Sequence, residues 1–253
     1  MSNWDSDIAA MSLSEAEKNG LQVYRNYRKA FEAHAEKAFA KELDDEKFDL
    51  RPLEQVGKHI ASEDVRFLPV IACAYADDQL NNMFKAELAK GGPSGRKEFF
   101  GPFGPVSNLF NRIQLAYAFE MLSQDLMLDL DKIRQARNDL SHTWDISLLS
   151  DFFTKGPVTE VFPIDTLLSE RQDWFPSARK SLEPLLVFRI RLIWILARLT
   201  YEAGCYARAK KRRLNPVQAL YGQHHPKRLA DIANIAGEES RRIISPQSPA
   251  SHT

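Results

Sequence analysis

The chain has 253 residues, enough for one large domain, or one domain with extensions, around a sizeable core. Lysine plus arginine and aspartate plus glutamate each number 34, so the formal net charge is zero. Two cysteines without a disulfide framework, no signal peptide and three arginines within the longest apolar run, Leu185 to Leu199, argue against a secreted or membrane-spanning protein and indicate a cytoplasmic one.

The first helix is predicted from a capping signal. Ser14 and Glu17 have the spacing of a capping box, so we expect a helix from there to about Glu42. Its apolar side is formed by Val23, Tyr24, Tyr27, Phe31 and Phe39. After a charged break, Pro52 begins a short helix that runs to about His59. We interpret residues 1–60 as an N-terminal helical extension.

The next two helices are separated by a loop rich in glycine and proline. Ser62 is placed to cap a helix with apolar residues from Phe67 to Leu88. In the loop from Gly91 to Pro105, three phenylalanines are expected to pin the chain to the body: Phe99, Phe100 and Phe103. Ser107 to about Met121 is apolar nearly all round, which predicts a central helix. Ser123 then caps the following helix, so the two form a tight hairpin.

That following helix, Leu126 to Asp145, is the clearest amphipathic stretch of the chain. Its stripe consists of Leu126, Leu130, Ile133, Arg137 and Leu140, spaced four, three, four and three apart. An arginine therefore occupies a position where the pattern requires an apolar residue. Because a guanidinium cannot lose its proton, burying it needs a carboxylate or phosphate partner.

Asp77 and Asp78, in the middle of the helix before the loop, are the expected carboxylates. Adjacent residues on a helix point about 100° apart, so the two should not share a metal ion. We expect one of them to pair with Arg137 or with Arg112.

A long connection follows, with Pro157, Pro163 and Pro176 and a short helix near Ile164 to Ser169. Ser177 to about Tyr206 is predicted as the final core helix. From Cys205 onward, nine lysines and arginines face three acids. We interpret residues 207–253 as a basic, partly disordered tail with at most short helices.

Two features of this tail suggest ligands. The basic residues Lys210, Lys211, Arg212 and Arg213 could contact a nucleic-acid backbone or, equally, cap the negative end of the preceding helix. A weak helix-turn-helix pattern from Ile232 to Ile243 has Glu238 at a usually apolar position, so we do not expect it to read DNA. His224 and His225 have no second ligand pair nearby, and we predict neither a metal site nor a cofactor.

Together these elements predict an all-α fold, a bundle of about six helices with residues 61–206 as its core. No strand alternation is present in the sequence. We expect a cytoplasmic homodimer.

Three segments resemble the mannitol-repressor family of bacterial proteins. The first is Gly101-Pro102-Phe103-Gly104, which leads into Leu109 to Tyr117. The second is Ile133 to His142 with the polar and aromatic turn after it, and the third is the long loop that returns to an apolar helix. The resemblance covers roughly residues 62–204. It implies an all-helical regulatory protein that binds a partner protein or nucleic acid without catalysis.

Arg137, Asn138 and His142 also resemble the signature of the HEPN superfamily: an arginine, a polar residue, three further residues and a histidine. This resemblance implies an alternative function as a metal-independent endoribonuclease that acts as a dimer.

The chemistry of RNA cleavage explains why these residue types matter. Attack of a 2′-hydroxyl on its own phosphate needs a general base, a general acid and a cation. Histidine serves as base or acid and arginine grips phosphate oxygens, so a two-fold dimer would bring two copies of His142 to one cleft. On one ideal helix, however, Arg137 and His142 point about 140° apart. The competing interpretation is an internal Arg137 paired with Asp77 or Asp78, and His142 as a helix C-cap.

Overall fold

The computed structural model describes residues 4–88, 95–142 and 184–244. Within these ranges every regular element is a helix, which confirms the predicted all-α class, although the helices outnumber the six or so expected. None of the helices in these ranges is long and apolar enough to cross a membrane. The short helix predicted near Ile164 to Ser169 lies outside the described residues.

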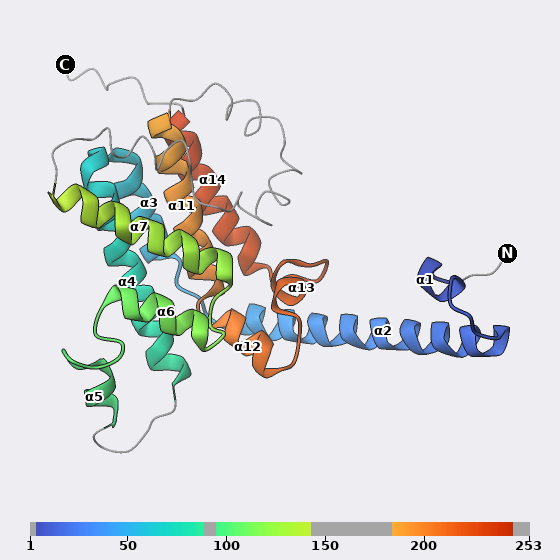
Figure 1. The fold of residues 1–253 in the computed structure, drawn as a ribbon. Helices are drawn as coiled ribbons and strands as arrows, with labels where there is room; N and C mark the ends of the chain where they lie inside the picture. Colours follow the sequence, from blue (N-terminus) through green and yellow to red (C-terminus); the bar gives the residue numbers. More distant parts are fainter. Residues whose placement is uncertain (1–3, 89–94, 143–183, 245–253) are drawn as a thin grey trace.

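The N-terminal part of the chain forms an arm. Helix α2 (Glu15–Asp45) projects from the helical body, and the short α1 (Ser6–Ala9) lies at its free end (Figure 1). The predicted capping box is confirmed, since the Ser14 Oγ accepts from the Glu17 amide and the Glu17 carboxylate accepts from the Ser14 amide. Phe39, Ala40 and Leu43, near the other end of α2, are buried in the body.

Helices α3 (Arg51–Ser62) and α4 (Leu68–Glu87) agree with the predicted elements, and the turn η1 (Val65–Phe67) joins them. Ser62 does not cap α4, contrary to the prediction. Ser62 is the last residue of α3, where its hydroxyl donates to the Lys58 carbonyl. Asp64 instead caps the turn η1, where its side chain accepts from the Arg66 amide at 2.9 Å, and α4 begins without a side-chain cap.

The predicted hairpin is present as α6 (Leu109–Ala118) and α7 (Gln124–His142), preceded by α5 (Gly95–Phe100). Asn108, not Ser107, caps α6. Helix α6 buries one side only, since three aromatic residues in it or directly after it are 40–50% exposed: Phe110, Tyr117 and Phe119. Phe99 and Phe100 pack on the core as expected, whereas Phe103 is fully exposed and pins nothing.

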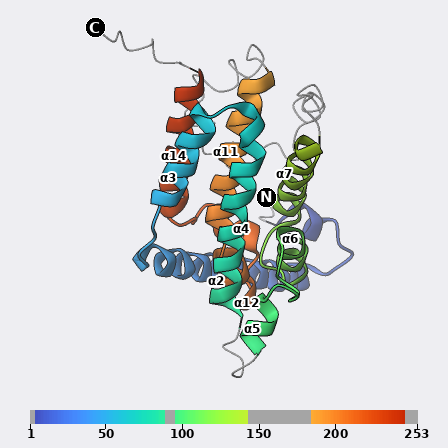
Figure 2. The same ribbon diagram turned by 90° about the vertical axis from the view of Figure 1, so that its left-hand side faces the viewer.

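Helix α11 (Pro184–Glu202) is the centre of the body, and α3, α4 and α14 (Arg228–Ile244) pack around it (Figure 2). The predicted helix to Tyr206 is broken, because Gly204 adopts a left-handed conformation with φ of 80° and a new helix, α12 (Cys205–Lys211), follows. Helix α13 (Pro216–Tyr221) then leads to α14.

The prediction of at most short helices after residue 207 is wrong. Helix α14 is 17 residues long and buries Leu229, Ile232, Ala236 and Ile243 against α11 and α3. Gly57 allows the close approach of α3, since a Cβ atom there would lie 2.9 Å from the Glu239 Cγ. The segment from Ile232 to Ile243 is one uninterrupted helix, so no helix-turn-helix is formed.

A buried charged group joins three of these helices. The Glu202 carboxylate, at the end of α11, is fully buried and accepts from the Arg198 Nε at 2.8 Å and the Tyr221 hydroxyl at 2.9 Å. It also accepts from the amide and hydroxyl of Ser123, just before α7, at 3.0 and 3.1 Å. The Arg198 Nη2 donates to the same hydroxyl. The residue predicted as a simple cap of α7 therefore belongs to a network in the core.

We predict that Glu202→Ala lowers the free energy of unfolding by about 3–5 kcal/mol, because it leaves the Arg198 charge buried without its partner. The matched control is Glu32→Ala. Glu32 accepts from Arg28 at the same 2.8 Å and the same four-residue spacing, but on the solvated surface of α2. Its loss should cost less than about 0.5 kcal/mol. Urea denaturation of both variants is the measurement, and equal losses would contradict the prediction.

Candidate functional site

Arg137 lies in a cleft between the beginning of α4 and the end of α7. The cleft has a volume of about 710 Å³ and is lined by Arg66, Phe67, Val70, Arg137, Leu140, Ser141 and His142. Arg66 and Phe67 come from η1 and Val70 from the first turns of α4, so residues about 70 positions apart in the sequence form one surface.

The Arg137 guanidinium is held by a neutral group. Its Nη2 and Nε donate to the Asn138 Oδ1 at 2.9 and 3.3 Å, and the Ser141 hydroxyl donates to the Asn138 carbonyl at 2.6 Å. Arg137 is half-buried, and within the described residues no carboxylate forms an ion pair with it. An amide oxygen orients the guanidinium without balancing its charge, so the positive charge remains available to a ligand.

Of the two partners predicted for Asp77 or Asp78, Arg112 forms the ion pair, with Asp77, and Arg137 does not. The Arg112 Nη1 lies 2.5 Å from the Asp77 Oδ2, and its Nε donates to the Val106 carbonyl at 2.8 Å. Asp77 therefore faces α6 rather than α7, because the side chain of Arg112, only 11% exposed, fills the space beside it. Asp78 is exposed.

The structure brings two of the three predicted catalytic residues together. Arg137 and His142 both line the cleft, despite the angle between them on the helix, since the cleft is wide and lies at the end of α7. His142 is exposed in the last turn of α7. The negative end of the helix dipole stabilises a cation at such a position. Asn138 does not line the cleft and acts on it only through Arg137.

Sequence reasoning missed the opposite wall of the cleft. Phe67 and Val70 are 57% and 49% exposed, although their spacing is that of a core-facing helix. They lie three residues apart at the beginning of α4 and thus project from one side of it. An aromatic ring and a valine facing water beside two arginines form a surface suited to a ligand with both an anionic and a flat apolar part.

The charges around the cleft are predominantly positive. Arg66 forms an ion pair with Asp64 at 2.9 Å, and its hydrogen bonds lower the pKa of Asp64 to about 2. Burial raises the pKa of the nearby Cys73 thiol to about 11, although the charges of Arg137 and Arg134 oppose this rise. Cys73 is therefore protonated near neutral pH and is not a nucleophile.

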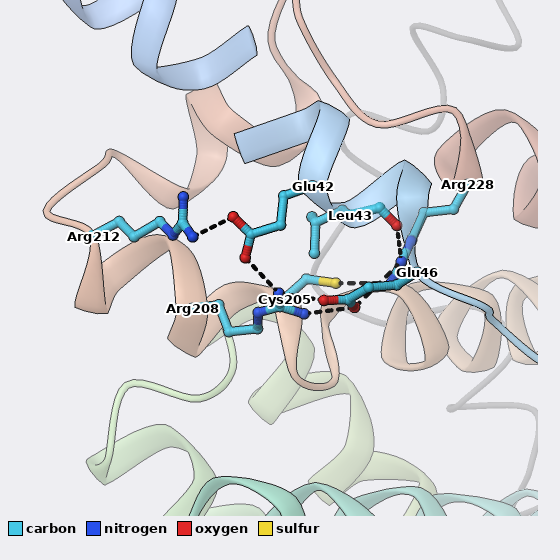
Figure 3. Close-up of polar contacts among 7 residues, drawn as sticks. All are labelled: Glu42, Leu43, Glu46, Cys205, Arg208, Arg212 and Arg228. Carbon is cyan, nitrogen blue, oxygen red and sulfur yellow. Dashed lines mark hydrogen bonds and ion pairs between the residues drawn. The ribbon is translucent and has the colours of Figure 1, made fainter. Parts of the chain in front are cut away.

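Three of the four residues of the basic cluster in the predicted tail make ion pairs within the chain, and Arg213 is exposed. Lys210 pairs with Glu120 at 3.0 Å and Lys211 with Glu87 at 2.5 Å. Arg212 pairs with Glu42 of α2, as shown in Figure 3. A nucleic-acid contact by this cluster stays a prediction, and the phosphates would have to compete with three carboxylates.

Arg208 and Arg228 extend these contacts along the end of α2 (Figure 3). Arg208 bridges Glu42 at 3.0 Å and Glu46 at 2.6 Å, and the Arg228 guanidinium donates to the Leu43 carbonyl. We call this group of contacts the α12 clamp, and it consists of Glu42, Leu43 and Glu46 at the end of α2, Arg208 and Arg212 of or just after α12, and Arg228 of α14. The clamp joins positions more than 160 residues apart, and no local pattern in the sequence could have indicated it.

The neighbouring histidines of the α13–α14 connection form no apparent metal centre. The His225 Nδ1 lies 2.9 Å from the Gly222 carbonyl. In the part of the chain that the structure describes, no group of three or more histidine, cysteine, aspartate or glutamate side chains is arranged to hold a metal ion.

Comparisons with known proteins add no family. No protein-family model matches the chain, and neither the curated proteins nor the solved structures contain a match. The resemblances to the mannitol-repressor family and to the HEPN superfamily therefore rest on the quoted residues alone.

We predict that the two arginines differ in their contribution to stability. Arg112→Ala should lower the free energy of unfolding by about 1–3 kcal/mol, less than for a fully buried pair because Asp77 still reaches water. Arg137→Ala should cost less than about 1 kcal/mol, since no carboxylate of the described residues loses a partner. Thermal or urea unfolding measures both, and a larger loss for Arg137→Ala would show that this arginine is structural.

Proposed function

We propose that the protein is a cytoplasmic regulator of the mannitol-repressor kind that binds single-stranded RNA in the cleft between α4 and α7. The observation that carries this proposal is Arg137. Its half-buried guanidinium is oriented by the Asn138 amide and faces a cleft, with no carboxylate partner among the described residues. The two free, buried cysteines, Cys73 and Cys205, agree with a reducing compartment.

The rest of the cleft supports RNA as the ligand. The fork of an arginine such as Arg137 binds two phosphate oxygens at once, whereas Arg66 on the facing wall is already paired with Asp64. The exposed ring of Phe67 offers a flat apolar surface on which an unpaired base can stack. A duplex keeps its bases stacked inside, so this combination favours single strands.

Binding without catalysis is favoured over cleavage by the number of titratable groups. Cleavage of RNA needs one group to accept a proton and another to donate one. Of the described residues that line the cleft, only His142 has a side chain of the kind that commonly transfers protons. The described residues of one chain therefore supply the cleft with a phosphate-binding cation and one proton-transfer group.

The test is the affinity for a labelled single-stranded RNA of about ten nucleotides, within the site sizes of known single-strand binders. Arg137→Gln should weaken binding roughly 10- to 100-fold, the equivalent of ~1.5–3 kcal/mol for a charge-assisted hydrogen bond. Phe67→Ala should also weaken binding, through the loss of stacking. Binding by the unchanged protein should fall as salt rises.

The matched control is Arg134→Gln. Arg134 lies on the same helix but already pairs with Asp131 at 2.8 Å and does not line the cleft. This variant should retain affinity within about threefold. If Arg134→Gln and Arg137→Gln weaken binding equally, the cleft is not the site, and if the unchanged protein does not bind RNA the proposal fails.

A second candidate function is metal-independent RNA cleavage of the HEPN type, favoured by the presence of Arg137 and His142 in one cleft. It would require a dimer that brings the second His142 to the same phosphate. The expected result is cleavage of RNA in the presence of a chelator, abolished by His142→Ala while RNA affinity is retained. Intact RNA after prolonged incubation with the unchanged protein would eliminate this candidate.

A further inference from the structure

The exposed face of the α2 arm carries an aromatic stripe. Val23, Tyr24, Tyr27 and Phe31 are 63–71% exposed and lie at the three- and four-residue spacings of one helix face. Four large apolar side chains in contiguous exposure mark an interaction site rather than scattered surface residues.

The stripe lies on the side of α2 that no other described element covers. The buried residues of α2 are Gln22, Glu36, Phe39, Ala40 and Leu43. At about 100° per residue, their mean direction is roughly 160° from that of the stripe. Helix α1 packs on the covered side as well, since Asp5 and Asp7 pair with Arg25. The stripe thus faces away from both the body and α1.

We propose that the stripe pairs with the same stripe of a second copy of this chain, with the two α2 helices antiparallel. The stripe is self-complementary under such a two-fold arrangement. Tyr27 is its midpoint, so a two-fold axis there places Tyr27 beside its own copy and Phe31 of one chain against Val23 and Tyr24 of the other. Aromatic side chains attract one another beyond the area they bury.

The charges beside the stripe select the antiparallel orientation. Glu15 lies twelve residues before Tyr27, and Lys37 and Lys41 lie ten and fourteen residues after it. All three are exposed and fall on one flank of α2, within about 80° of one another, with Lys41 beside the stripe and Glu15 about 135° from its mean direction. A two-fold axis perpendicular to α2 brings this flank against the same flank of the second copy, so Glu15 meets Lys37 and Lys41. In a parallel pair this flank would face the opposite flank of the second copy, so Glu15 would not meet Lys37 and Lys41.

The area that the stripe can bury is also large enough for pairing with a second helix. Three aromatic side chains that bury roughly 150–250 Å² each when fully covered, and that are about two-thirds exposed, offer on the order of 400 Å² per chain. With Val23 and the stems of the flanking residues, two copies approach the roughly 1,200 Å² at which specific interfaces begin. The arm projects from the body, so a partner helix has access along its length (Figure 1).

The first test is the mass of the nuclease-treated protein by light scattering and sedimentation across a concentration series. The unchanged protein should be a dimer, and Tyr27→Glu should raise the dissociation constant at least 100-fold while the helix content by circular dichroism is unchanged. The matched control is Phe103→Glu, which changes an equally exposed aromatic residue outside the arm and should leave the dimer intact. A monomeric unchanged protein, or an unaffected Tyr27→Glu dimer, overturns the proposal.

The second test is the orientation of the helices. Positions 20 and 34 lie at equal distances from Tyr27, and a Cβ atom at Gly20 meets nothing within 4 Å in the single chain. When the Gly20→Cys and His34→Cys proteins are mixed, they should form a disulfide-linked heterodimer. The native Cys73 and Cys205 are buried and should not form disulfides between chains. Disulfides within each variant alone, without the mixed product, would overturn the antiparallel arrangement.

The third test uses the charges. Glu15→Lys should weaken the dimer about 10-fold, and addition of Lys37→Glu with Lys41→Glu should restore it. A triple variant no tighter than Glu15→Lys alone overturns the proposed register. None of the three tests measures RNA binding, so their outcome is independent of the proposed function.

Discussion

The arrangement of the body depends on the buried carboxylate of Glu202. It is fully covered, and it accepts hydrogen bonds from Arg198 of α11, from Ser123 before α7 and from Tyr221 of α13. A buried carboxylate is stable only when its oxygens are paired, so the beginning of α7 and the end of α13 have to meet the end of α11. Burial beside this carboxylate also raises the pKa of Tyr221, which keeps its hydroxyl a donor. With one end of α7 tied to the core, its other end is positioned opposite α4, and the cleft follows from that placement.

The contrast between Arg112 and Arg137 shows how the fold separates structural from available charge. Both arginines belong to the same hairpin, and both were candidates for the acids of α4. Arg112 forms an ion pair with Asp77 and is nearly buried, so the Asp77 carboxylate balances its charge within the structure. Arg137 meets an amide, which fixes its direction and leaves its charge unbalanced. An orientation without neutralisation is what an anion-binding site needs, because the ligand then supplies the missing charge and meets a guanidinium already in place.

Local patterns predicted the elements well and the long-range pairs poorly. The capping box of Ser14 and Glu17 and the hairpin around Ser123 depend on neighbours in the sequence, and both are present. The α12 clamp depends on residues more than 160 positions apart, so the basic cluster that contains Arg212 was predicted only as a nucleic-acid contact or a helix cap. Helix α14 was predicted as part of a tail because prolines punctuate this segment (Pro216, Pro226, Pro246 and Pro249), and only packing on α11 and α3 explains its length. Phe67 and Val70 followed a core pattern, yet no described element covers them fully. The spacing of apolar residues shows that a helix is amphipathic, but not whether a partner within the chain covers its apolar face.

The end of α7, which lines the cleft, and the free end of the arm lie on opposite sides of the helical body (Figure 1). If two chains pair through their arms, the body of each chain lies between its own cleft and the paired arms, so this pairing does not bring the two copies of His142 to one phosphate. Such a dimer lacks the second proton-transfer group that cleavage requires, so arm pairing and two-histidine catalysis exclude each other unless a further contact joins the chains. The same dimer presents two separate cationic clefts to one strand of RNA. When the strand spans both, the second binding event becomes intramolecular, and two clefts of modest affinity act as one tighter site. The exposed aromatic face of α2 would then contribute to RNA binding without contacting RNA, by setting the distance between the clefts.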